Sequence, residues 1–195
     1  MSIEYYNKNS QKFFDDTVNI EMTAFYDQFL PLVKDKGKIL DVGCGSGRDV
    51  KAFNSLGYNS IGIDASKELV AKANSIIQGK IFFMKYLDIE WVNEFDGIWA
   101  CASLLHEELN NIENVIQKLW KSLRVNSPFY MSFKYGENSY IKNERFFQNY
   151  NEKTINPYLK NLKNKKIHKI WQTFDRRPTR QNEKWLNIIL LKIHQ

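Results

Sequence analysis

The residues best suited to chemistry form a glycine-rich turn in the first quarter of the chain. Residues 39–49 read Ile-Leu-Asp-Val-Gly-Cys-Gly-Ser-Gly-Arg-Asp, so a short apolar run ends in an acid and glycines follow at every second position. This pattern predicts a strand, a tight turn and the start of a helix, because glycine lets a backbone bend sharply and approach a ligand closely. A turn for nicotinamide dinucleotides carries its third glycine one position later, where this chain has Arg48. A dinucleotide site is therefore the weaker interpretation.

A second acid, Asp64, ends the next predicted strand, residues 58–63. A carboxylate at this place can accept hydrogen bonds from both ribose hydroxyls of an adenosyl group. The alternative is that Asp64 caps the helix predicted over residues 67–77, but Ser66 is the better cap. We therefore expect Asp64 to bind ribose.

Residues 41–47, which read Asp-Val-Gly-Cys-Gly-Ser-Gly, resemble the first motif of the class I S-adenosylmethionine-dependent methyltransferases. Within that family the chain looks most like the small stand-alone bacterial enzymes of the tellurite-resistance type. The resemblance implies an α/β fold with a Rossmann-like, seven-stranded, mostly parallel sheet, an antiparallel last strand and helices on both faces. It also implies S-adenosylmethionine as the cofactor, S-adenosylhomocysteine as the product, and in-line displacement at a sulfonium as the reaction.

The resemblance places the cofactor against the turn and the ends of the neighbouring strands. Leu87 and Asp88 take the position that borders the adenine. Tyr6 lies in the leading helices, which often fold over the cofactor in this family, although packing on the sheet is an equal alternative. Cys101 is expected to be a wall residue, because the Pro-Cys motif of cytosine-carbon methyltransferases is missing. The expected cofactor-binding residues are Tyr6, Asp41, Gly43, Cys44, Gly45, Arg48, Asp64, Ala65, Leu87, Asp88 and Cys101.

His106 is the candidate catalytic base, because the resemblance implies that the segment after the fourth strand faces the methyl group. A helix-capping or packed histidine is an equal alternative. Tyr135, which leaves the fifth strand, and Arg145 are expected to bind the substrate. Arg145 lies in residues 137–150, where interleaved aromatic and basic residues suit a substrate lid or a partly packed connection.

The elements that must position these residues follow from apolar periodicity. Strands alternate with helices through the middle of the chain, which predicts a parallel sheet, and two further apolar runs close it. Helices are expected over residues 5–16, 20–33, 49–56, 67–77, 111–123 and 154–162, and strands over residues 39–42, 58–63, 81–84, 95–101, 129–134, 166–174 and 185–193.

Composition bounds the class of protein. With 195 residues, 43% of them hydrophobic, we expect a single domain over residues 1–195, with a helical cap at 1–35 and the core at 36–195. No apolar run approaches the roughly 20 residues that span a bilayer, and no signal-peptide pattern opens the chain, so we expect a cytoplasmic protein without membrane contact. Two cysteines and three histidines show no metal-ligand spacing, so no metal is expected.

The net charge of +6 is unevenly distributed. Residues 142–180 carry 11 Lys and Arg against 3 Asp and Glu, whereas residues 1–141 carry 15 against 18. The basic stretch is either a solvated lysine-rich face or a surface for phosphate or nucleic acid. Methyl transfer to a small-molecule acceptor is the main hypothesis. An RNA methyltransferase and a non-catalytic S-adenosylmethionine-binding regulator are the alternatives, and the sequence leaves the oligomeric state open.

Overall fold

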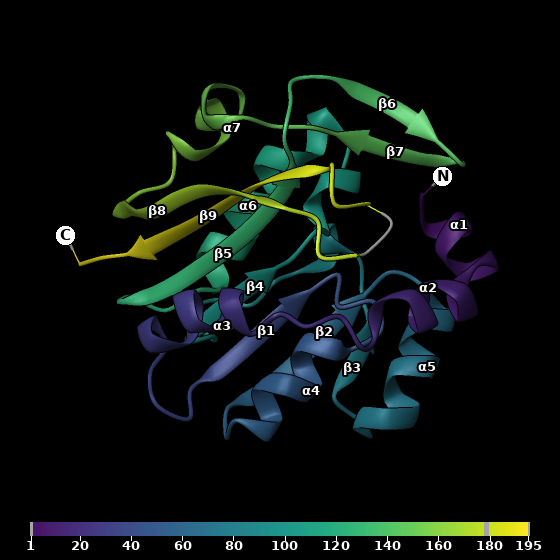
Figure 1. Cartoon of the computed structure of the whole chain (residues 1–195). Helices are drawn as coiled ribbons and strands as arrows, with labels where there is room; N and C mark the ends of the chain where they lie inside the picture. Colours follow the sequence, from purple (N-terminus) through teal and green to yellow (C-terminus); the bar gives the residue numbers. More distant parts are fainter. Residues whose placement is uncertain (1, 178–179, 195) are drawn as a thin grey trace.

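The computed structural model describes residues 2–177 and 180–194. Its centre is a seven-stranded sheet in the order β3-β2-β1-β4-β5-β9-β8 (Figure 1). Strands β1 to β5 run parallel to one another, and β9 runs antiparallel to both of its neighbours. This is the predicted fold class. The strands of the sheet are β1 Lys38–Val42, β2 Asn59–Asp64, β3 Ile81–Phe83, β4 Gly97–Ala100, β5 Ser127–Lys134, β8 Lys165–Phe174 and β9 Lys184–Lys192.

Different helices cover the two faces of the sheet, because successive side chains of a strand point to opposite faces. Trp99 and Tyr130 pack with α3 and α4, whereas their neighbours Ile98 and Phe129 pack with α6 and α7. Strands buried on both faces need apolar residues at every position, which is why β4 reads as a continuous apolar run. From residue 23 onward, the α-helices of the described chain are α3 Thr23–Phe29, α4 Arg48–Ser55, α5 Lys67–Ile77, α6 Leu109–Ser122 and α7 Glu152–Leu159.

The strand order reverses between β1 and β4, and this reversal determines where a ligand can bind. The connections from these two strands leave toward opposite faces, so a crevice opens at their carboxyl ends. Asp41 pairs in register with Gly62 of β2 and with Trp99 of β4. Asp41, Asp64 and Cys101, which come from three different strand ends, therefore meet at the same edge of the sheet.

The predicted N-terminal helices are interrupted. Residues 5–16 belong to two helices, α1 (Ser2–Lys8) and α2 (Ser10–Thr17). They separate at Asn9, whose side-chain amide donates to the Tyr5 carbonyl at 2.9 Å and competes with the helical ladder. In residues 20–33 the α-helix ends at Phe29, and a 3-10 helix follows, because Pro31 has no backbone N–H to continue the ladder.

The predicted lid loop is a β-hairpin. Strands β6 (Ser139–Lys142) and β7 (Arg145–Gln148) pair antiparallel. Asn143 and Glu144 between them both have positive φ, of 50° and 57°, as a two-residue hairpin turn requires. The hairpin lies beside the N-terminus (Figure 1), and the Phe146 backbone N–H donates to the Ser2 hydroxyl at 3.1 Å.

The last two predicted strands are confirmed as β8 and β9. Trp185, near the start of β9, pairs with Lys134 at the end of β5. The β8–β9 connection therefore returns to the carboxyl edge of the sheet, near the crevice. Among the described residues, no helix has the length and apolar character that crossing a membrane needs.

Candidate active site

The glycine-rich turn holds its shape through backbone angles that favour glycine. Gly43 and Gly45 have φ values of 70° and 54°, and the Gly43 N–H donates to the Ile63 carbonyl at 2.8 Å. A Cβ atom on Gly43 would collide with the Tyr86 hydroxyl, and one on Gly45 would lie 2.8 Å from the Phe13 ring. Both angle and space therefore require glycine here.

Asp64 links the glycine-rich turn to the end of β2 through hydrogen bonds. Its Oδ2 accepts from the Gly45 N–H at 2.9 Å and its Oδ1 from the Ser66 N–H at 2.8 Å. The Ser66 hydroxyl accepts from the Leu69 N–H at 3.2 Å, so Ser66 is the cap of α5. Each carboxylate oxygen has two acceptor sites, which leaves Asp64 one on each oxygen. Burial raises the pKa of Asp64, although the backbone hydrogen bonds oppose this effect.

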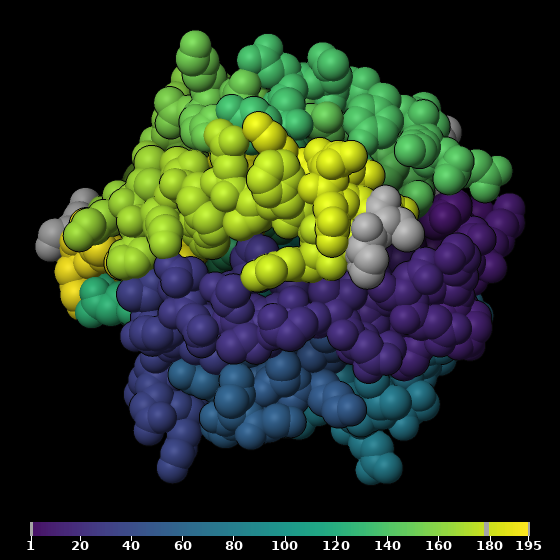
Figure 2. Space-filling view, viewed as in Figure 1, coloured from purple at the N-terminus to yellow at the C-terminus, as the bar shows by residue number. Residues whose placement is uncertain are grey.

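Two adjoining cavities open at the carboxyl edge of the sheet. The Asp64 cavity lies toward β2 and α5, and the Asp41 cavity lies toward β5 and β9. Figure 2 shows a hollow between the N-terminal segment and the β8–β9 segment. Six residues line both cavities: Tyr6, Phe13, Gly43, Gly45, Ala102 and His106.

The Asp64 cavity contains some of the expected cofactor-binding residues. Ala65 and Leu87 line it, as do Tyr86 and Ser103, which the sequence had not indicated. Asp88 is exposed and is not among the lining residues. Residues 86–88 form a 3-10 helix, in which consecutive side chains point about 120° apart, so neighbours in sequence face different directions.

Asp41 is buried beside the second cavity. It is 2% exposed, and within the described chain its Oδ2 has no hydrogen-bond partner. Burial raises its pKa well above the usual range, and the nearby Asp49 adds to this shift. A buried oxygen without a partner costs free energy. Asp41 is therefore an acceptor available to a donor group of a ligand.

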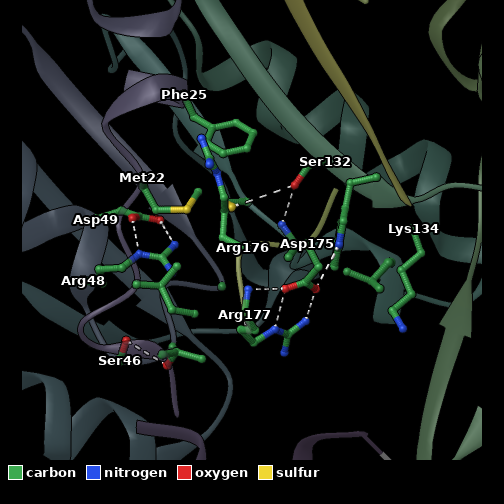
Figure 3. A pocket seen from close by; sticks show the side chains of 18 of the residues that line it. Met22, Phe25, Ser46, Arg48, Asp49, Ser132, Lys134, Asp175, Arg176 and Arg177 are labelled. Atoms are coloured by element: carbon green, nitrogen blue, oxygen red, sulfur yellow. Dashed lines mark hydrogen bonds and ion pairs between the residues drawn. The ribbon is translucent and has the colours of Figure 1, made fainter. Parts of the chain in front are cut away.

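Arg48 lines the Asp41 cavity, but its guanidinium group is paired with Asp49. The Arg48 Nε and Nη2 atoms donate to the two carboxylate oxygens of Asp49 at 2.7 and 2.8 Å (Figure 3). The same carboxylate accepts from the Tyr26 hydroxyl at 2.5 Å and the Trp99 indole at 2.8 Å. Burial favours protonation of Asp49, but the charge and hydrogen bonds of Arg48 prevail and lower its pKa. The Arg48 charge is thus neutralised within the protein.

Both ring nitrogens of His106 form hydrogen bonds. Its Nδ1 lies 2.7 Å from the Phe146 carbonyl, which can only accept, so Nδ1 carries the proton. Its Nε2 therefore accepts from the Tyr6 hydroxyl, at 2.7 Å. Burial lowers the pKa of His106 to about 4, and the charges of Arg145 and Lys134 add to this shift. The imidazole is neutral at pH 7, and its lone pair points to Tyr6.

The two expected substrate residues lie in different places. Arg145 is 9% exposed and lines the Asp41 cavity. Tyr135 lies outside both sets of lining residues, and its hydroxyl donates to Glu152 at 3.2 Å. Since side chains alternate at the end of β5, Lys134 faces the cavity and Tyr135 does not.

The cysteines have the environment of wall residues. Cys101 lines the Asp41 cavity, and burial raises its pKa to about 12, with the Asp49 charge adding to the shift. The Cys44 sulfur packs behind the turn, where a Cβ atom on Gly62 would lie 2.7 Å from it. Cys44 therefore contributes its backbone to the site.

The β8–β9 connection supplies residues that sequence reasoning missed. Asp175, Arg176, Arg177 and Arg180 line the Asp41 cavity. Arg177 Nε and Nη2 donate to Asp175 at 2.9 and 2.5 Å (Figure 3). Because β9 is antiparallel to β5, it starts beside the carboxyl end of β5. The antiparallel direction predicted for the last strand was therefore the signal that could have placed this connection at the site.

The residues of both cavities fit an adenosyl cofactor. Asp64 has one acceptor site left on each oxygen, Asp41 has an unpartnered buried oxygen, and the glycine turn lets a ligand approach its backbone. Across residues 2–177 and 180–194, no group of three or more His, Cys, Asp or Glu is arranged to hold a metal ion.

This sheet order, the glycine turn after β1 and the acid at the end of β2 are the features expected of a class I S-adenosylmethionine-dependent methyltransferase domain. Known proteins agree with this class. Residues 39–126 match the family described as "Methyltransferase domain". Over 114 residues the chain is 28% identical to YqeM of Bacillus subtilis, a protein named as a methyltransferase by inference. That match covers 54% of this chain and 46% of YqeM, so the chain spans about half the length of this relative.

Solved structures share the fold. The 1,6-didemethyltoxoflavin-N1-methyltransferase of Burkholderia thailandensis, solved with 1,6-didemethyltoxoflavin and S-adenosylhomocysteine, gives a TM-score of 0.75 at 17% identity, over 98% of this chain and 85% of that one. An S-adenosylmethionine-dependent methyltransferase of Methanosarcina mazei gives 0.75 at 18% identity, over 85% of this chain and 97% of that one. The predicted class is confirmed. The likeness to the tellurite-resistance type stays a prediction.

Proposed function

We propose that this chain transfers the methyl group of S-adenosylmethionine to a small-molecule acceptor. The observation that carries the proposal is the pair of adjoining cavities. The Asp64 cavity has the groups that suit a nucleoside, and the Asp41 cavity continues beyond the glycine turn into a space walled by polar and aromatic side chains. The B. thailandensis relative is named for a small-molecule acceptor, which supports an acceptor of this kind.

Different residues would bind different parts of the cofactor. Asp64 would hold the ribose, Leu87 and Ala65 the adenine, and Asp41 the amino-acid end of the cofactor. When bound, S-adenosylmethionine supplies a methyl group on a sulfonium whose leaving thioether is neutral. The protein therefore has no developing anion to stabilise. Its main contribution is positioning, worth about 7–11 kcal/mol in well-aligned intramolecular reactions.

Tyr6 and His106 are placed to remove a proton from an acceptor that carries one. Both line the two cavities, and the Tyr6 hydroxyl donates to His106 Nε2. A proton from the acceptor would pass to the Tyr6 oxygen as the Tyr6 proton passes to Nε2. The predicted base thus acts through a tyrosine.

Helix α1 and the β6–β7 hairpin are suited to close the site. The Phe146 N–H of the hairpin donates to the Ser2 hydroxyl of α1. His106 provides a second link, because it accepts from the Tyr6 hydroxyl of α1 and donates to the Phe146 carbonyl. Closure of this kind excludes water and strengthens electrostatic contacts inside. We infer that the hairpin and α1 together act as the lid.

Two measurements test the proposal. Calorimetry should show binding of S-adenosylmethionine and S-adenosylhomocysteine, and none of nicotinamide dinucleotides at matched concentration. Incubation with S-adenosylmethionine and fractionated metabolites should then release S-adenosylhomocysteine in at least one fraction. Binding of a nicotinamide cofactor with similar affinity would contradict the cofactor assignment. Tight cofactor binding without turnover on any fraction would favour a regulator.

A further inference from the structure

Many of the side chains that line the Asp41 cavity are basic. Cations line it from four parts of the fold: the glycine turn, β5, the β6–β7 hairpin and the β8–β9 connection. They are Arg48, Lys134, Arg145, Arg176, Arg177 and Arg180.

Acids within the protein neutralise three of these cations. Arg48 is bound to Asp49, as described above, and Arg177 is bound to Asp175. The Lys134 ammonium lies 2.7 Å from a carboxylate oxygen of Glu183. These three pairs are internal, so they leave little charge for a ligand.

Arg145 differs from these three. It is 9% exposed, it forms no ion pair with a described residue, and its Nε has no hydrogen-bond partner there. Aromatic rings surround it instead: its guanidinium carbon lies 4.2 Å from the Tyr5 ring centroid and 5.1 Å from that of Phe147. Ring faces stabilise a cation only in part, whereas removal from water is costly. Arg145 is therefore a buried cation without an anionic partner among the described residues.

Arg176 and Arg180 add positive charge to the same cavity. In the described part of the chain neither forms an ion pair, and the Arg176 guanidinium carbon lies 5.5 Å from the Phe25 ring centroid. Figure 3 shows Arg176 and Phe25 together at one side of the pocket, apart from the Asp175–Arg177 pair. The remaining acid in the lining, Asp41, is the one whose pKa is raised well above the usual range by burial. The cavity thus has an excess of positive charge.

We propose that the methyl acceptor is a small oxyanion, carrying a carboxylate or a phosphate that binds to Arg145, with Arg176 and Arg180 drawing it into the Asp41 cavity. This inference rests on the proposed methyl transfer and names its substrate class. Guanidinium groups match carboxylates and phosphates because two parallel N–H groups reach two oxygens. The depth of Arg145 favours a small molecule over RNA, since a ligand must enter the cavity to reach it.

The test uses the full chain saturated with S-adenosylhomocysteine and calorimetric titration of three probes. Benzoate and inorganic phosphate carry the two oxyanions, and benzamide is the neutral counterpart of benzoate. Arg145→Gln removes the proposed charge. Lys166→Gln makes the same charge change on an exposed residue of β8 that lies outside both cavities. Arg180→Gln is a second, partly exposed cavity variant in case Arg145→Gln does not fold.

We expect benzoate or phosphate to bind and benzamide not to bind, and the probe that binds identifies the oxyanion. Arg145→Gln should weaken this binding at least about tenfold, the loss expected for one charge-assisted hydrogen bond, and Lys166→Gln should leave it unchanged. Arg180→Gln should weaken it as well. Equal binding of benzoate and benzamide, no binding of either anion, or equal effects of the cavity variants and Lys166→Gln would overturn the inference. Binding of S-adenosylhomocysteine, measured first, reports separately on the proposed function.

Discussion

Replacing Asp64 by Ala tests the centre of the site. The carboxylate already accepts the Gly45 and Ser66 N–H groups, one on each oxygen. Its remaining acceptor site on each oxygen matches the two hydroxyls of a ribose. Asp64→Ala should therefore remove two charge-assisted hydrogen bonds to the cofactor while it leaves the apolar walls of the cavity in place.

The expected loss follows from the strength of these bonds. A hydrogen bond to a charged group contributes roughly 1.5–3 kcal/mol, and about 1.4 kcal/mol corresponds to a factor of ten in affinity. Loss of even one such bond should weaken binding of S-adenosylhomocysteine at least about tenfold. The loss of both should exceed this.

The assay must separate the ribose contacts from the shape of the turn, because Asp64 also holds Gly45. Competition against labelled S-adenosylhomocysteine with adenosine and with 2′,3′-dideoxyadenosine forms a double cycle with the substitution. Wild type should prefer adenosine clearly, and Asp64→Ala should bind the two nucleosides about equally. Asp88→Ala is the matched control, since this carboxylate is exposed and lies outside both cavities.

Two results would refute the reasoning. One is unchanged affinity in a folded Asp64→Ala variant. The other is an equal preference for adenosine in wild type and variant, which would assign Asp64 to holding the turn alone.

Three further predictions concern the ionisation of His106, the proton path through Tyr6 and the lysines within residues 163–166. The pKa of His106 is lowered to about 4 by burial, so its contribution to stability is full above pH 6.5 and falls by up to about 3 kcal/mol toward pH 4. Urea unfolding at pH 7 and pH 5 should show a larger loss in wild type than in His106→Gln, and parallel losses would contradict this. Tyr6→Phe should lower kcat at least about a hundredfold, as for loss of a general base, with S-adenosylhomocysteine affinity nearly unchanged, whereas retained kcat would give the Tyr6–His106 pair a packing role. Replacing Lys163, Lys165 and Lys166 together by Gln should leave methyl transfer intact in a radioactive assay, and an inactive triple variant would favour a nucleic-acid acceptor.

The sheet and its glycine turn could be predicted from the sequence because local patterns determine them. A strand buried on both faces favours a continuous apolar run, which β4 and residues 128–131 of β5 provide by themselves. Positive φ values at Gly43 and Gly45 demand glycine at those positions. Asp64 is the last residue of β2, so the end of this strand places it at the edge of the sheet.

Other parts of the site depend on contacts between residues distant in sequence. Tyr6 and His106 are 100 residues apart, and only packing of α1 over the carboxyl edge makes the tyrosine a donor to that histidine. The isolation of Arg145 among aromatic rings arises in the same way, from the meeting of the hairpin with α1.

The tertiary structure also decided which neighbour faces the cavity. Lys134 and Tyr135 are adjacent, and the sequence led us to expect Tyr135 at the site. Leu87 and Asp88 are also adjacent, and we expected both. Strand alternation placed Lys134 at the Asp41 cavity, and the 3-10 helix placed Leu87, which is partly exposed, at the Asp64 cavity. The apolar pattern of the sequence determined the scaffold, because burial of such residues is a local property. The direction of each polar side chain was determined only when the strands, helices and hairpin packed together.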